Sequence, residues 1–111
     1  MDPVFDIDRS QVDGHARVRF VGELDMAAVE QAHAEVIDVL DHTGGALTID
    51  LSSLSFCDAS GVRLLFKLDS EAKARGRALV LQHPTPAVRR VFRVLDAVDH
   101  LTIEDRSDAL S

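Results

Sequence analysis

Apolar and polar positions follow two different periods along the chain, and the changes of period mark the expected elements. Residues 15–21 alternate between apolar and polar side chains, the period of a half-buried strand. The stretch 4–8 is short and mixed, and the Asp13-Gly14 pair between the two segments favours a tight turn. The chain is therefore expected to open with a β-hairpin. Two basic side chains of the second strand are expected to be solvated: Arg17 and Arg19.

A helical period follows this hairpin. Asp25 is expected to cap a helix that begins at Met26, with Leu24 and Val29 spaced to pack as a hydrophobic staple. The Gly44-Gly45 pair is expected to end this helix, because glycine tolerates the left-handed conformation found just past a C-terminus. The expected apolar stripe of the helix consists of Val29, Ala32, Val36 and Leu40.

A second strand–helix unit begins at Ala46. Apolar residues alternate over 47–51, and Leu54 and Phe56 extend the apolar character of this strand toward a polar turn. The helix after the turn is expected to end near Gly76, which follows basic residues typical of a C-terminal turn. Its expected buried positions are Val62, Leu64, Leu65, Phe66, Leu68 and Ala72.

A third unit completes the chain. The continuous apolar run 78–81 predicts a strand covered on both faces. Thr85 is the expected N-cap of a third helix and Pro86 its first residue, where the missing amide costs nothing. A last short strand is expected over 101–104, and the tail from about 105 has little room to begin another helix. The residues of the third helix expected to face inward are Val88, Val91, Phe92 and Leu95.

The order of these elements predicts one α/β domain over residues 1–111. Helical crossovers return the chain in the same direction, so the sheet is expected to be mostly parallel with an antiparallel N-terminal edge strand. A chain of 111 residues with 46% hydrophobic content buries one modest core and is too short for two independent domains.

Composition narrows the classes of partner and compartment. The formal net charge of −7 disfavours binding to nucleic acid or to anionic lipid, so a protein or small-molecule partner is expected. The N-terminus lacks the pattern of a signal peptide, and no apolar run approaches membrane-spanning length. With a single cysteine, Cys57, the chain fits a reducing compartment, and we expect a cytoplasmic protein that is a monomer or weak dimer.

Most candidate reactive groups have simpler interpretations. Cys57 precedes the polar turn at a core-facing position and has no base paired with it, which predicts a buried thiol and not a nucleophile. The five histidines show no metal-ligand spacing, so we assign no metal and no cofactor. The basic face formed by Arg89, Arg90 and Arg93 is interpreted as solvated in so acidic a chain. The chain is not expected to be an enzyme.

The polar turn at 58–60 offers more specific chemistry. Free backbone amides at a helix N-terminus attract anions, including a phosphoryl group. Phosphorylation there would add nearly two negative charges beside Asp25 and Asp58, and a partner fitted to the neutral surface would be expelled. The simpler alternative is that Asp58 or Ser60 only caps the helix.

Three segments give the chain a resemblance to STAS domains that covers nearly its whole length. They are Gly22-Glu23-Leu24-Asp25, Phe56-Cys57-Asp58-Ala59-Ser60-Gly61-Val62 and Pro86-Ala87-Val88-Arg89-Arg90-Val91-Phe92. In bacterial STAS proteins that act as anti-sigma factor antagonists, the turn carries a serine or threonine, directly after the aspartate, that a partner kinase phosphorylates. The matching residue here is Ala59. Ser60 keeps a hydroxyl one position later, either as a shifted acceptor or as a cap.

The resemblance implies a regulator that binds an anti-sigma factor of the serine-kinase type and so releases a sigma factor. Without the usual acceptor it would be permanently unphosphorylated, unless Ser60 has taken over that role. Two alternatives remain: an accessory subunit of a transport assembly, and a sensor of a small anionic ligand. The expected partner surface consists of Asp25, Met26, Asp58, Ala59, Ser60, Arg63 and Lys67, although Arg63 and Lys67 also fit a solvated stripe.

Overall fold

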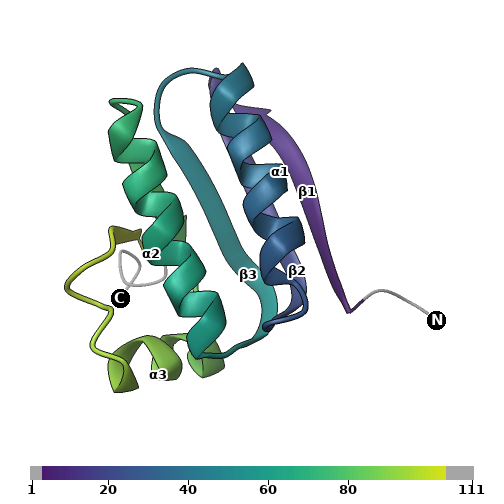
Figure 1. Cartoon of the computed structure of the whole chain (residues 1–111), viewed down its shortest axis with the longest axis vertical. Coiled ribbons are helices and arrows are strands. Elements are labelled where there is room, and N and C mark those ends of the chain that lie inside the picture. The colour runs from purple at the N-terminus through teal and green to yellow at the C-terminus, as the bar shows by residue number, and fades with distance from the viewer. Residues whose placement is uncertain (1–3, 105–111) are drawn as a thin grey trace.

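A five-stranded sheet and three helices form the protein in the computed structural model, which describes residues 4–104 (Figure 1). The strands are β1 (Phe5–Val12), β2 (His15–Leu24), β3 (Leu47–Cys57), β4 (Leu79–Gln82) and β5 (Ile103–Glu104). The helices are α1 (Val29–His42), α2 (Ala59–Ala74) and α3 (Pro86–Val94). None of the described helices is long and apolar enough to cross a membrane.

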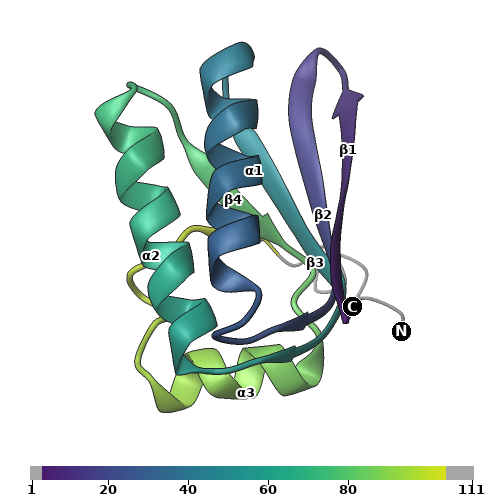
Figure 2. The same ribbon diagram turned by 45° about the vertical axis from the view of Figure 1, so that its right-hand side comes forward.

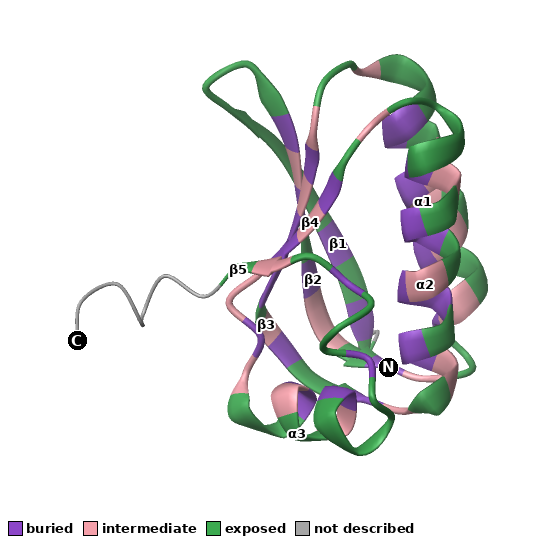
Figure 3. Cartoon of the chain, turned by 90° about the vertical axis from the view of Figure 1, so that its left-hand side faces the viewer, coloured by how far each residue is buried: buried purple, intermediate pink, exposed green. Residues whose placement is uncertain are grey.

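The strands lie side by side in chain order. β1 is antiparallel to β2, and every later pair is parallel, so the predicted mixed sheet with an antiparallel N-terminal edge is confirmed. Because right-handed crossovers that advance in one direction leave their helices on one side, α1 and α2 share one face of the sheet. Figures 2 and 3 show these two helices on that face and α3 across the end of the sheet. The core lies between this helical pair and the sheet.

The predicted N-terminal hairpin is present. Its turn places Asp13 at φ 53° and Gly14 at φ 80°, the pair of left-handed residues that matches the twist of a two-residue hairpin. β2 runs through Leu24, three residues beyond the expected end of the strand.

The first helix begins later than predicted. α1 starts at Val29, and residues 25–28 form a turn in front of it, so Asp25 is not the N-cap of the helix. Its carboxylate instead accepts the amides of Ala27 and Ala28, at 3.0 and 3.2 Å. At the other end, α1 stops at His42, and Gly45 adopts φ 76° as the chain turns toward β3.

Strand β3 contains two irregularities that change which side chains face the core. Its register against β2 slips between Arg19 and Val21 and again between Gly22 and Glu23, so β3 carries extra residues on each occasion. A β-bulge shifts the period-two alternation by one position. Leu54 and Cys57 therefore point inward, whereas Phe56, which extends the apolar character of this strand in the sequence, is 46% exposed.

The face of the sheet away from α1 and α2 is polar. Arg17 donates to Asp50 at 2.9 Å and to Gln82 at 2.6 Å, which corrects the prediction that Arg17 is simply solvated. Arg19 donates to exposed Asp8 at 2.8 Å. In β4 only alternate residues are buried, so the prediction of a strand covered on both faces is also wrong.

The third helix follows its predicted caps. Thr85 accepts the amide of Val88 at 3.3 Å, and Pro86 is the first helical residue. Leu95 does not face inward as predicted: it lies past the helix end and is 42% exposed, since the chain turns away at Asp96 with φ 55°. The last strand is limited to Ile103–Glu104. The expectation for a tail from about residue 105 lies outside the described residues.

Candidate functional site

The site is built where the carboxyl ends of β2 and β3 meet. The amide of Asp58 donates to the carbonyl of Leu24 at 3.3 Å, which joins the turn before α1 to the start of α2. Gly61 permits this approach, because a Cβ there would lie 2.7 Å from Sγ of Cys57 and 2.8 Å from the carbonyl oxygen of Leu24. Only a glycine lets the first turn of α2 sit this close to the strands.

A second glycine shapes the end of β2. Gly22 has φ 100°, and a Cβ on it would lie 2.1 Å from the carbonyl oxygen of Val4. That carbonyl instead accepts the amide of Glu23 at 2.8 Å. Backbone geometry thus requires a glycine at position 22, where the register of β2 against β3 changes shortly before the chain reaches Asp25 and Met26.

Asp58 and Ser60 form one capping unit at the start of α2. Oδ1 of Asp58 accepts the hydroxyl of Ser60 at 2.5 Å and the amide of Gly61 at 3.1 Å. The hydrogen bond from Ser60, followed by those from backbone amides, holds the pKa of Asp58 below its usual value despite partial burial. The carboxylate is therefore ionised near neutral pH, and its Oδ1 is occupied within the protein.

Ala59 stands on the outside of this cap. It is exposed, whereas Ser60 is half-buried and keeps its hydroxyl turned toward Asp58. Ala59 thus presents only a methyl group at this surface. The neighbouring hydroxyl has a structural partner.

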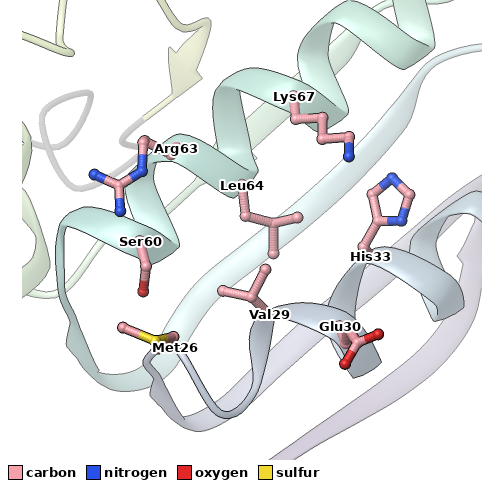
Figure 4. A pocket seen from close by; sticks show the side chains of 8 residues that line it. All are labelled: Met26, Val29, Glu30, His33, Ser60, Arg63, Leu64 and Lys67. Atoms are coloured by element: carbon pink, nitrogen blue, oxygen red, sulfur yellow. The ribbon is translucent and has the colours of Figure 1, made fainter.

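A cavity of about 380 Å³ opens between the first turns of α1 and α2 (Figure 4). Met26 lies at its mouth and is 78% exposed, while Leu64 closes its floor from α2. Figure 4 shows Ser60 directed toward Met26, and Val29 facing Leu64 across the hollow. The residues that line it are Met26, Val29, Glu30, His33, Ser60, Arg63, Leu64 and Lys67.

The structure thus brings four predicted surface residues around one cavity: Met26, Ser60, Arg63 and Lys67. Asp58 and Ala59 adjoin them in the chain, whereas Asp25 is turned back onto the amides of its own loop. Sequence reasoning missed the contribution of α1. Val29 was assigned to the core alone, and Glu30 and His33 carried no signal because their proximity to α2 depends on helix packing.

The two cations at this site differ from five others in the described chain, although Arg77, Arg90 and Arg93 likewise form no ion pair within residues 4–104. Arg63 and Lys67 are exposed, one turn apart on α2, and within residues 4–104 neither forms an ion pair. Five other cations each do: Arg9, Arg17, Arg19, Lys73 and Arg75.

Two further groups lie near the site. Cys57 is buried, as predicted, and burial followed by the charge of Asp58 raises the pKa of its thiol to about 12, so it is not a nucleophile at neutral pH. Nε2 of His33 lies 3.5 Å from Oε2 of Glu71 on α2, across the helix pair. Residues 4–104 contain no group of three acidic, histidine or cysteine side chains placed to hold a metal ion.

Comparison with known proteins agrees with this geometry. The family model described as "Mlab, STAS domain" matches residues 7–103. The chain belongs to the STAS domain family. The resemblance drawn from its three sequence segments is therefore confirmed.

Relatives of this STAS domain include anti-sigma factor antagonists and a transporter. An anti-sigma F factor antagonist of Lysinibacillus sphaericus is 33% identical over 95 residues, which covers 78% of this chain and 81% of that protein. The anti-sigma factor antagonist SpoIIAA in its unphosphorylated form is 28% identical, with a TM-score of 0.72 over 95% of this chain and 93% of that one. The murine anion transporter Slc26a9 is 26% identical with a TM-score of 0.64, over 73% of this chain and 14% of the transporter.

Proposed function

We propose that this STAS domain is an anti-sigma factor antagonist that binds a serine-kinase-type anti-sigma factor, without catalysis of its own, and so releases a sigma factor. The proposal rests on one observation: the largely exposed, uncharged side chain of Met26 lines the cavity between α1 and α2, and exposed Ala59 directly precedes another lining residue, Ser60. Exposed apolar side chains beside a hollow are typical of protein contact surfaces. The proposed surface consists of Asp25, Met26, Asp58, Ala59, Ser60, Arg63 and Lys67.

We propose further that the phosphorylation switch is absent. A kinase must position the acceptor hydroxyl of its substrate precisely against the transferred phosphoryl group, and one residue along a helix turns a side chain by about 100°. Ser60 is displaced in this way from the acceptor position, and its hydroxyl donates to Asp58. The protein would then stay in its binding state and be regulated by its abundance.

The test is titration calorimetry with the serine-kinase-type anti-sigma factor of the same organism. Wild type should bind, and Met26→Lys should weaken binding without changing the melting temperature, because Met26 is largely exposed. Val12→Lys places the same charge on an exposed valine at the hairpin, at the opposite end of β2, and should bind as wild type does. Failure of the wild type to bind would contradict the proposed function.

A second candidate is an accessory domain of a transport assembly. The likeness to part of the anion transporter Slc26a9 favours it, although two anti-sigma factor antagonists are matched over more of both chains. If this candidate is correct, the anti-sigma factor should not bind, whereas a transport protein should co-purify and lose its affinity with Met26→Lys. The anionic-ligand sensor and the monomeric or weakly dimeric state remain predictions.

A further inference from the structure

The charges around the α1–α2 cavity are not balanced within the described protein. Two cations on the α2 rim, Arg63 and Lys67, have no carboxylate partner within residues 4–104, although the chain carries a net charge of −7. The nearby carboxylates do not supply one. Asp25 accepts two amides of its own loop, and Asp58 accepts Ser60 and Gly61.

The opposite rim carries the reverse charge. Glu30 lines the cavity from α1 and, within the described residues, also forms no ion pair. In Figure 4 its carboxylate points away from α2, while the amine of Lys67 extends toward His33. The cavity thus has a basic rim on α2 and a single acidic group on α1, with the apolar residues Val29 and Leu64 between them.

We infer that the segment of the partner that enters this cavity is acidic and carries an aliphatic side chain. The aliphatic group would fill the hollow against Val29 and Leu64, and carboxylates beside it would pair with Arg63 and Lys67. Complementary charges at an interface set the association rate and exclude wrong partners, whereas an apolar plug in a pocket supplies most of the affinity. This inference rests on the proposed function, because it describes the anti-sigma factor that the same surface would bind.

The charge pattern also explains why a negative group at position 59 would oppose binding. A phosphoryl or carboxylate there would lie one turn before Arg63 on α2 and would compete for the cation that the partner's carboxylate uses. An acidic partner segment would in addition be repelled directly. An alanine at this position leaves both cations available.

The test measures the dissociation constant of the complex with the same purified anti-sigma factor at low and at high salt. Arg63→Glu and Lys67→Glu should each weaken binding about tenfold at low salt, and wild-type affinity should fall as salt rises. Glu30→Gln removes the one acidic group of the rim. At low salt this variant should bind the partner as tightly as wild type or more tightly. Arg19→Glu, in an exposed pair with Asp8 on the face of the sheet away from α1 and α2, changes the net charge equally and should have little effect.

The outcomes separate this inference from the proposed function. Unchanged affinity and salt dependence in Arg63→Glu and Lys67→Glu, together with weakened binding by Ala59→Asp, would overturn the acidic segment and leave the proposed function standing. Tighter binding by Arg63→Glu and Lys67→Glu than by wild type would show that the partner segment is basic, which would also overturn the inference. Absence of wild-type binding would overturn both. Circular dichroism melts of each variant establish that the compared proteins are folded.

Discussion

The hydroxyl of Ser60 donates a 2.5 Å hydrogen bond to Oδ1 of Asp58, and this contact makes the two residues one structural unit at the start of α2. The same carboxylate oxygen accepts the amide of Gly61. The hydroxyl nearest the expected phosphorylation position is therefore used to orient a helix cap, while the exposed residue beside it, Ala59, has no oxygen to modify.

This arrangement predicts that removing the side chain of Asp58 and removing that of Ser60 lower the stability of the protein by different amounts. Asp58→Ala should destabilise the protein by about 1 kcal/mol, because an N-cap carboxylate is lost. Ser60→Ala should cost less, since Asp58 still accepts the amide of Gly61. Denaturant unfolding of both variants measures the difference. A larger loss in Ser60→Ala than in Asp58→Ala would show that the hydroxyl, and not the carboxylate, organises the turn.

Sequence reasoning predicted the parts of the fold that local chemistry decides. The Asp13-Gly14 hairpin, the Thr85 cap before Pro86 and the end of α2 near Gly76 each depend on a few consecutive residues. The parallel sheet followed from the order of elements, because crossover handedness leaves few arrangements. The turn at Asp58 was also predicted from consecutive residues, because a capping residue and a glycine directly follow a strand.

The errors arose where distant residues decide the structure. Whether β4 is covered on one face or on both depends on how the helices pack against the sheet. Arg17 has its partners Asp50 and Gln82 on β3 and β4, 33 and 65 positions away in sequence. Arg77 lies in the loop between α2 and β4 and donates to the carbonyls of Leu40 and Gly45, near the end of α1.

The candidate site shows the same division. Its α2 residues were predicted because they follow one another on a helix. The cavity itself was not, because it requires α1 to pack beside α2, and Glu30 and His33 resemble ordinary surface residues in the sequence.

Gly61 is predicted to be intolerant of even a methyl group. Gly61→Ala should destabilise the protein by about 1–3 kcal/mol through overpacking against Cys57 and Leu24. This loss should exceed the gain of up to about 1 kcal/mol that alanine brings to a helix. Gly44→Ala, with open space around its Cβ, should change stability by no more than about 0.5 kcal/mol. Equal effects of the two substitutions in thermal melts would disprove the close approach.

The Asp50–Arg17 pair predicts a loss of stability in acid. Burial raises the pKa of Asp50, but hydrogen bonds from Ser52 and the guanidinium of Arg17 outweigh it, so the pKa of Asp50 lies below its usual value of 3.8. A carboxylate with a depressed folded pKa contributes stability that is complete above the unfolded pKa and disappears as pH falls through the folded one. The free energy of unfolding of wild type, measured in urea, should therefore fall below about pH 4.

The matched variants isolate this pair. Asp50→Asn should be less stable than wild type at pH 7 and should lose less stability on acidification, because the titrating group is gone. Arg17→Met should be strongly destabilised at pH 7, since it leaves Asp50, only 6% exposed, without its cation. If Asp50→Asn loses as much stability as wild type between pH 6 and pH 3, other carboxylates cause the acid sensitivity.

The most direct test of the proposal that the phosphorylation switch is absent is intact-mass spectrometry after incubation with the kinase-type anti-sigma factor, ATP and magnesium. Wild type should gain no phosphate, because Ala59 has no hydroxyl and that of Ser60 is bound to Asp58. Ala59→Ser should gain one phosphate, which shows that the kinase recognises the surface, while Ala59→Ser with Met26→Lys should gain less. Stoichiometric phosphate on the wild type, mapped to Ser60, would contradict the account and show that the acceptor has moved by one residue.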